Sequence, residues 1–171
     1  MKQNKQHGFL CGCLVLSAFF SPVLFALESD ADQPIIIDSN TATYDDKTEV
    51  SIYTGDVVFV QGSIRVHSDK LDVYFVNGEA EKLVFTGNLA KFRQKPNEGD
   101  EDITGEARIG EYYPKKDLLV LKKNATVWQG NGAYSSDYIQ YDIKTSLVKA
   151  GEKSSDAKRV HVVIKPKSKQ Q

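Results

Sequence analysis

Cysteine is almost absent from this sequence, and the two that occur lie close together near its start. Cys11 and Cys13 are the whole complement of the 171-residue chain, and both fall within an N-terminal apolar stretch. A chain that begins after this stretch has no disulfide, no thiol nucleophile and no thiolate metal site. Its fold must therefore be stabilised by backbone hydrogen bonding and an apolar core.

Histidine is also scarce, because His67 and His161 are the only two after the first 26 residues. His67 alternates with Arg65 on the face opposite Ile64 and Val66, so we expect it to face solvent. His161 lies in an apolar closing segment. Neither has a second histidine or a thiol at ligand spacing, and the sequence therefore predicts no metal site.

Signatures of catalysis are missing as well. The sequence has no phosphate-binding glycine loop, no nucleophile elbow and no zinc-binding helix. Carboxylates are numerous, but they fall at turns and strand openings, as at Asp45, Asp69 and Asp137, where hydrogen bonding to the backbone explains them. We expect a binding protein that is not an enzyme and carries no cofactor.

An excess of positive charge is lacking too. The chain has 22 basic and 23 acidic residues, and removal of Lys2 and Lys5 with the N-terminal stretch would leave 20 basic residues. A nucleic-acid-binding domain usually presents a basic surface. The charge balance therefore argues against nucleic acid as a partner.

The N-terminal stretch has the pattern of an export signal. Lys2 and Lys5 form a positive start, an apolar run follows, and Ala26 offers a small residue at the cleavage point. We expect residues 1–26 to be a cleaved signal peptide, 27–164 one domain and 165–171 a basic polar tail. A lipoprotein box at Cys13 is the alternative, but too few apolar residues precede it. A membrane anchor is disfavoured because Gly12, Ser17, Ser21 and Pro22 interrupt the run.

Four segments of the remaining chain share one pattern. Each has a polar opening, an alternating strand that ends near an aromatic residue, a tight turn, an apolar strand and a break at glycine, asparagine or aspartate. Asn77-Gly78 is a strong hairpin signal, since both central residues of such a turn need positive φ. The four units span residues 38–56, 68–88, 104–124 and 136–152, and residues 95–102 form a hydrophilic insertion.

Repeats of this length indicate a stacked architecture in which each unit packs on its neighbours. The apolar face changes parity between Ile64-Val66 and Leu71-Val73, with Ser68-Asp69-Lys70 between them, as one extra residue at a bend would cause. No helical periodicity follows the N-terminal stretch. We therefore predict an all-β, twisted antiparallel β-jellyroll. It would be a folded-over sheet of stacked hairpins with glycine kinks at Gly55 and Gly87, open at both ends around an apolar interior groove.

Two features remain unexplained by folding alone. An apolar groove between twisted sheets is the kind of site that takes lipid chains. The first strand, around residues 34–37, and the last, around 160–164, have no covering element, and bare edges invite pairing with another chain.

The same residues resemble a known family. The segments that carry the resemblance are Asp32–Ser39 (DQPIIIDS), Tyr53–Ile64 (YTGDVVFVQGSI), Ser68–Lys70 (SDK), Phe85–Asn88 (FTGN) and Asp117–Leu121 (DLLVL). In this order, after an apparent signal peptide, they are similar to the LptA family of periplasmic lipopolysaccharide-transport proteins with an OstA-type domain.

The resemblance implies a lipopolysaccharide carrier of Gram-negative bacteria that stacks head to tail with itself. Its stack would run from an inner-membrane extraction complex with an LptC-like component to an outer-membrane translocon with an LptD-like component. The positions matched to the lipid path, together with neighbouring interior positions, are Ile35, Ile37, Ile64, Val66, Phe92 and Tyr112. The positions expected at the interface between copies are Ile35, Ile36, Ile37, Val160, Val162 and Ile164.

Other interpretations of the sequence remain open. A secreted β-solenoid that binds or cleaves carbohydrate would need acidic residues gathered on one face, and the repeats do not concentrate them. A same-fold relative at either membrane would keep an N-terminal anchor or be far longer. A self-assembling surface protein is the last alternative.

Overall fold

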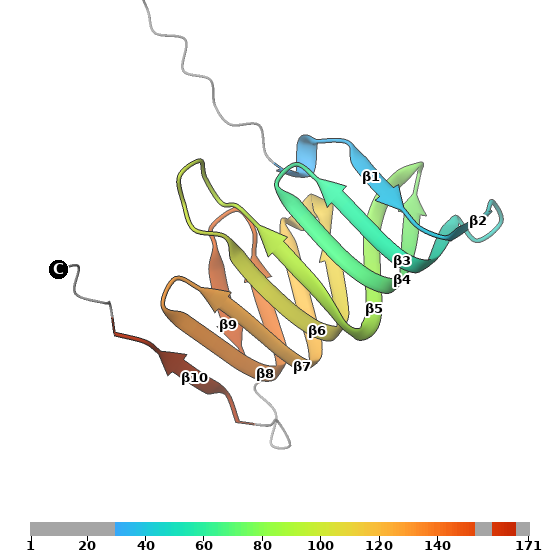
Figure 1. The fold of residues 1–171 in the computed structure, drawn as a ribbon. Coiled ribbons are helices and arrows are strands. Elements are labelled where there is room, and N and C mark those ends of the chain that lie inside the picture. The colour runs from blue at the N-terminus through green and yellow to red at the C-terminus, as the bar shows by residue number, and fades with distance from the viewer. Residues whose placement is uncertain (1–29, 153–158, 167–171) are drawn as a thin grey trace, which may run out of the picture.

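The computed structural model describes residues 30–152 and 159–166, which form one long antiparallel sheet that is folded over on itself (Figure 1). The predicted signal peptide and most of the predicted tail lie outside the described residues. The elements are η1 (Asp30–Asp32), β1 (Ile35–Asp38), β2 (Thr41–Asp45), β3 (Val50–Gln61), β4 (Ile64–Val76), β5 (Glu79–Gln94), β6 (Ile103–Tyr113), η2 (Pro114–Lys116), β7 (Leu118–Gln129), β8 (Gly132–Asp142), β9 (Leu147–Ala150) and β10 (His161–Ile164).

The strand order is β1-β3-β4-β5-β6-β7-β8-β10, with β2 paired to β3 and β9 paired to β8. Every pairing is antiparallel, as hairpin connections between successive strands require. The predicted turn at Asn77-Gly78 joins β4 to β5, and both residues have positive φ (53° and 79°). The all-β prediction is confirmed.

Each long strand crosses from one layer of the fold to the other at a bulge. The register shifts between Thr54 and Val57 in β3, between His67 and Lys70 in β4 and between Thr86 and Ala90 in β5, and the same happens in β6 and β7. The parity change read from the sequence is therefore a bend. The two layers are halves of one sheet, because the strands run through the bends.

Left-handed residues lie at the bends of β3, β5 and β7. Gly55 and Asp56 have φ of 83° and 45° in β3, and Lys123 and Asn124 have 63° and 56° in β7. In β5 the left-handed residue is Leu89 (φ 83°), whereas the predicted kink at Gly87 does not use positive φ. Glycine adopts such angles freely, whereas a side chain adds strain.

Layer 1 consists of β1, β10 and the parts of β3–β8 within residues 57–67, 90–107 and 125–136. Layer 2 consists of β2, β9 and the parts within residues 50–54, 70–86, 109–122 and 138–142. The bends close one long side of the molecule. The opposite long side, where the hairpin loops of both layers meet, is called the seam below.

Carboxylates at the strand openings brace the bends. The Asp69 carboxylate accepts a hydrogen bond from the Asn88 backbone N–H (3.0 Å), and the Asp137 carboxylate accepts one from the Asn124 N–H (3.3 Å). These aspartates occupy equivalent positions in the second and fourth repeats. The polar openings in the sequence thus stabilise the bend of the neighbouring strand.

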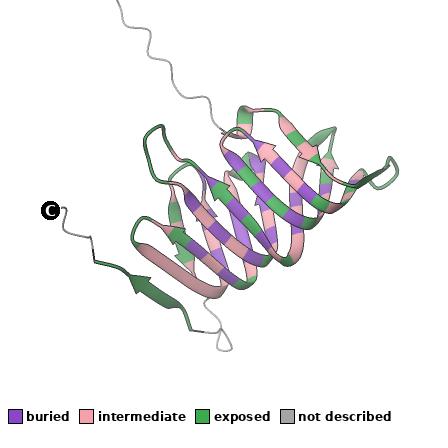
Figure 2. Ribbon diagram, in the orientation of Figure 1, coloured by how far each residue is buried: buried purple, intermediate pink, exposed green. Residues whose placement is uncertain are grey.

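The core lies between the two layers and is built from alternate residues of each strand, as Figure 2 shows by the striped burial of the ribbon. Phe59, Leu71, Leu83 and Ile139 are fully buried. The middle of the interior is therefore filled by the protein's own side chains.

Candidate lipid-binding interior and open sheet edges

The six residues predicted to contact lipid converge on one interior. Ile64, Val66, Phe92 and Tyr112 are buried in the core, and Ile35 and Ile37 are half-buried and pack against it. They come from β1, β4, β5 and β6, which the folding of the sheet brings together. Their role in lipid binding remains a prediction.

A cavity of about 290 Å³ lies between the layers at the β1 end of the interior. Ile35 and Ile37 line it from layer 1. The side chains that face them from layer 2 are Tyr53, Val73, Phe75 and Ala80. Sequence reasoning did not select these four, although the shared parity of Val73 and Phe75 already assigned both to one face.

Tyr112 differs from the other predicted lipid contacts because it carries a polar group, a hydroxyl, and this hydroxyl is hydrogen-bonded. The Tyr112 Oη donates a hydrogen bond to Oε1 of Gln61 (3.0 Å), and both side chains are buried. Burial raises the pKa of Tyr112 above its usual range, so the hydroxyl remains a donor. No local sequence pattern indicates this pair, because the two residues are 51 positions apart.

The seam carries a more polar hollow of about 710 Å³. Its walls come from the β3–β4 and β5–β6 loops of layer 1, from turns of layer 2 and from the N-terminal segment. The residues that line it include Asp30, Gln33, Ser63, Gln94, Lys95, Asp117 and Lys144.

Most large apolar side chains that are exposed among the described residues lie in or beside the edge strands. Ile36 is 56% exposed on β1, Val162 and Ile164 are 44% and 74% exposed on β10, and Val160 just before β10 is 40% exposed. The predicted interface residues thus lie at opposite ends of layer 1. The side chains of Ile35 and Ile37 point inward, so at this edge only their backbone is placed to contact another chain.

The edge of layer 2 was not foreseen. β2 and β9 also have one neighbouring strand each, so each end of the described fold presents two strand edges. The sequence assigned both segments to hairpins. A hairpin pattern does not show which strand lacks a second neighbour, because that depends on strand order.

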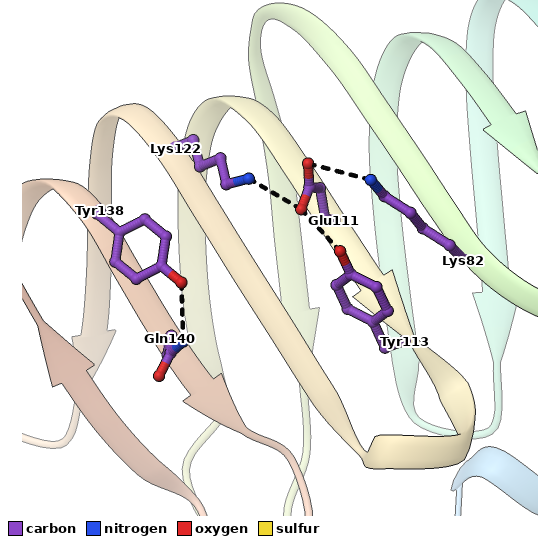
Figure 3. A network of polar contacts seen from close by, with 6 residues as sticks. All are labelled: Lys82, Glu111, Tyr113, Lys122, Tyr138 and Gln140. Carbon is purple, nitrogen blue, oxygen red and sulfur yellow. Dashed lines mark hydrogen bonds and ion pairs between the residues drawn. The ribbon is translucent and has the colours of Figure 1, made fainter. Parts of the chain in front are cut away.

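The outer face of layer 2 holds a charged network centred on Glu111 (Figure 3). Its carboxylate lies 3.4 Å from Nζ of Lys82 and 3.0 Å from Nζ of Lys122, and accepts a 3.0 Å hydrogen bond from the Tyr113 hydroxyl. Burial opposes ionisation of Glu111, but these hydrogen bonds and charges outweigh it and lower its pKa. The network ties β5, β6 and β7 together and faces away from the interior.

Side chains that could together hold a metal ion are not gathered in the part of the chain that the structure describes. No three potential metal-ligating side chains cluster within residues 30–152 and 159–166. His67 is exposed, as predicted. Over the same residues, no helix has the length and apolarity needed to cross a membrane.

A folded antiparallel sheet with an apolar interior and uncovered edges at both ends defines a β-jellyroll binding protein. The profile of the family described as LptA/(LptD N-terminal domain) LPS transport protein matches residues 36–147. The chain therefore belongs to this family, which confirms the resemblance seen in its sequence.

Individual relatives agree with the family match. The lipopolysaccharide export system protein LptH of Pseudomonas aeruginosa is 33% identical over 162 residues, covering 91% of this chain and 92% of that protein. LptA of Escherichia coli K12 is 35% identical over 144 residues, covering 83% and 76%. Both relatives are named as export system proteins, which agrees with the prediction that this chain is not an enzyme.

A solved structure shares the fold. The crystal structure of LptH from Pseudomonas aeruginosa, described as the LptA-homologous periplasmic component of the lipopolysaccharide transport device, aligns with a TM-score of 0.75 at 28% identity. The alignment covers 81% of this chain and all of the LptH chain. This match supports the jellyroll prediction.

Proposed function

We propose that the protein is a periplasmic lipopolysaccharide carrier that holds the acyl chains of lipid A between its two layers. The observation that carries this proposal is the continuous apolar interior, which reaches a cavity at the β1 end in a member of a lipopolysaccharide-transport family. The carbohydrate-binding alternative has no comparable support.

The physical basis is burial of hydrocarbon. Each CH₂ group removed from water contributes about 0.8 kcal/mol, so acyl chains strongly favour an enclosed apolar path. Transfer along such a path needs no reacting side chain. The direction of transport must come from a partner that supplies energy.

Copies of the protein stack head to tail in this proposal. The β1 edge of one copy would pair with the β10 edge of the next, and β2 with β9, so that both layers and the interior continue from copy to copy. Edges in monomeric proteins are usually protected by charges or proline. Neither β1, apart from its terminal Asp38, nor β10 carries a lysine, arginine, acidic residue or proline within its strand.

The backbone of β10 is oriented for such pairing. The Lys165 N–H donates to the Asn131 carbonyl (3.0 Å), and these residues continue the register in which Val163 faces Ala133. Because bonded pairs alternate along an antiparallel ladder, the N–H and C=O groups of Val162 and Ile164 point to the free edge.

The stack would connect an inner-membrane extraction complex with an LptC-like component to an outer-membrane translocon with an LptD-like component. Export through a cleaved signal peptide at residues 1–26 would place the chain in the periplasm, the compartment named for LptH. The division into signal, one domain from 27 to 164 and a basic tail belongs to the same proposal.

Photo-crosslinking in cells tests the carrier role. A photoreactive residue at Ile37 or Phe92 should form adducts with lipopolysaccharide, because both side chains face the interior. The matched control is Ile36, which lies on the same strand and points outward. Absence of lipid adducts from both interior positions would overturn the proposal.

A further inference from the structure

Three glutamines occupy equivalent places where strands of layer 1 reach the seam. Gln61, Gln94 and Gln129 are the last residues of β3, β5 and β7. Each follows an interior apolar residue by two positions, namely Phe59, Phe92 and Val127, all of which belong to the core. A polar side chain therefore replaces an apolar one at the end of each interior row.

Two of these glutamines are bonded to tyrosines of the opposite layer. The Tyr112 hydroxyl on β6 donates to Oε1 of Gln61 (3.0 Å), and the Tyr141 hydroxyl on β8 donates to Oε1 of Gln94 (2.6 Å). The first bond joins β3 in layer 1 to β6 in layer 2, and the second joins β5 in layer 1 to β8 in layer 2. All four side chains are at most 4% exposed.

The other end of each amide is bonded to the N-terminal segment. Nε2 of Gln61 donates to the carbonyls of Ala31 and Gln33 (3.0 Å each), and Nε2 of Gln94 donates to the Asp30 carboxylate (3.1 Å). Carbonyl and carboxylate oxygens can only accept, which fixes Oε1 toward the tyrosines. Residues 30–33 are thus tied across the layer 1 side of the seam.

Packing alone does not account for these polar groups. The Tyr112 ring lies 6.1 Å from Phe59, and the Tyr141 ring lies 5.7 Å from Phe92 (centroid distances), so phenylalanine would fill the same space. The two layers are already connected covalently at the bends. The tyrosine hydroxyls add hydrogen bonds between the layers on the opposite side, at the seam.

The interior cannot accept a multi-chain lipid without widening. Its cavity at the β1 end measures about 290 Å³. Pockets that bind small molecules usually begin at about 300 Å³, so this cavity is too small for several acyl chains. Because the strands run unbroken through the bends, the layers can separate most readily at the seam. That movement must break the two glutamine–tyrosine bonds.

We propose that the pairs Gln61–Tyr112 and Gln94–Tyr141 form a seam latch, which holds the empty carrier closed and opens when acyl chains enter between the layers. This inference rests on the proposed carrier function. The latch opposes binding, so lipid affinity is set partly by hydrogen bonds that the bound state lacks. It also keeps the apolar interior away from water until a lipid arrives.

The test compares matched tyrosine-to-phenylalanine variants of the purified protein. Tyr112→Phe and Tyr141→Phe keep the ring but remove the latch bond. Tyr138→Phe is the control, because its hydroxyl accepts a 2.8 Å bond from Gln140 on the same strand and outside the seam (Figure 3). Dissociation constants for fluorescently labelled lipopolysaccharide are measured for each protein.

Each latch variant is expected to bind lipopolysaccharide about two- to tenfold more tightly, the range for one net hydrogen bond. Tyr138→Phe is expected to bind like the parent protein. Unchanged or weaker binding by both latch variants, while the parent protein binds, would overturn the latch and leave the carrier function standing. If the parent protein binds no lipopolysaccharide, the carrier function fails and the latch with it.

A measurement on the parent protein covers the case in which a variant folds poorly. In nuclear magnetic resonance spectra, the hydroxyl hydrogens of Tyr112 and Tyr141, which are donated to Gln61 and Gln94, should exchange slowly with water in the empty protein and faster at saturation with lipopolysaccharide. The hydroxyl hydrogen of Tyr113, which is donated to Glu111 on the outer face, should keep its exchange rate. Persistent protection of the Tyr112 and Tyr141 hydroxyls in the bound state would overturn the latch.

Discussion

Phe59 of layer 1 and Phe85 of layer 2 meet edge to face at the centre of the interior, with ring centroids 5.3 Å apart and an interplanar angle of 71°. Neither side chain is more than 1% exposed. Aromatic pairs favour this geometry and stabilise a fold beyond the apolar area they bury. The contact fixes the separation of the two layers away from the covalent bends.

Removal of one ring of this pair should strongly destabilise the protein. Phe85→Ala is expected to lower the free energy of unfolding by about 3–5 kcal/mol, because it leaves a cavity that the bends keep from collapsing. Urea denaturation followed by circular dichroism measures the change. The control Val76→Ala, at a side chain that is 47% exposed, should change the free energy by less than about 0.5 kcal/mol. A similar loss for both variants would contradict this account of the core.

Glycine at the bend of β7 should make the protein more stable than the lysine that stands there, Lys123. Lys123 is exposed and has φ of 63°, so Lys123→Gly should raise the free energy of unfolding by about 0.5–1 kcal/mol through relief of backbone strain. Lys91→Gly is the matched control at an exposed site in a paired part of β5. There glycine should destabilise. Thermal unfolding of both variants checks the opposite signs, and a loss of stability at both sites would count against strain in the bend.

The network on the outer face predicts a dependence of stability on pH. Since the pKa of Glu111 is lowered in the folded state, its contribution is present above its usual value of 4.5 and is lost as pH falls through the folded pKa. Glu111→Gln should therefore be less stable than the parent at pH 7, by on the order of 1 kcal/mol, and should approach it at pH 3.

Urea denaturation at several pH values measures this convergence. Glu98→Gln, in the exposed loop between β5 and β6, serves as the control and should follow the parent curve. A constant difference between Glu111→Gln and the parent from pH 7 to pH 3 would show that the carboxylate charge is not responsible.

Assembly through the β10 edge depends on backbone donors that point to the free edge, and one of these donors can be removed by mutation. Val162→Pro deletes an N–H that points to the free edge, so it should reduce self-association at least tenfold while β10 stays paired with β8. Val162→Ala shortens the same side chain but keeps the N–H and should assemble nearly as the parent does. Sedimentation velocity over a concentration series compares the three proteins. Equal assembly of Val162→Pro and Val162→Ala would refute pairing at this edge.

Much of the fold could be predicted because its signals are local. The turn at Asn77-Gly78 and the parity change around Ser68–Lys70 each depend on a few neighbouring residues, and both appear in the structure as a hairpin and a bend. The cavity at the β1 end was not predicted as a separate feature. The family resemblance implied a lipid-path role for Ile35 and Ile37, whereas Tyr53 and Ala80 meet them only after the sheet has folded over.

The sequence by itself determined an all-β chain of repeated hairpins with interior rows of apolar residues, because alternation and turn chemistry act within a few positions. Only the tertiary structure decided which residues face one another between the layers. Gln61 meets Tyr112 and Gln94 meets Tyr141, at separations of 51 and 47 positions. The twist of the sheet and the bends at its bulges bring β3 opposite β6 and β5 opposite β8. The residues of a single strand do not determine which strand of the other layer will face it. The open edges of β2 and β9 were decided in the same way, by strand order.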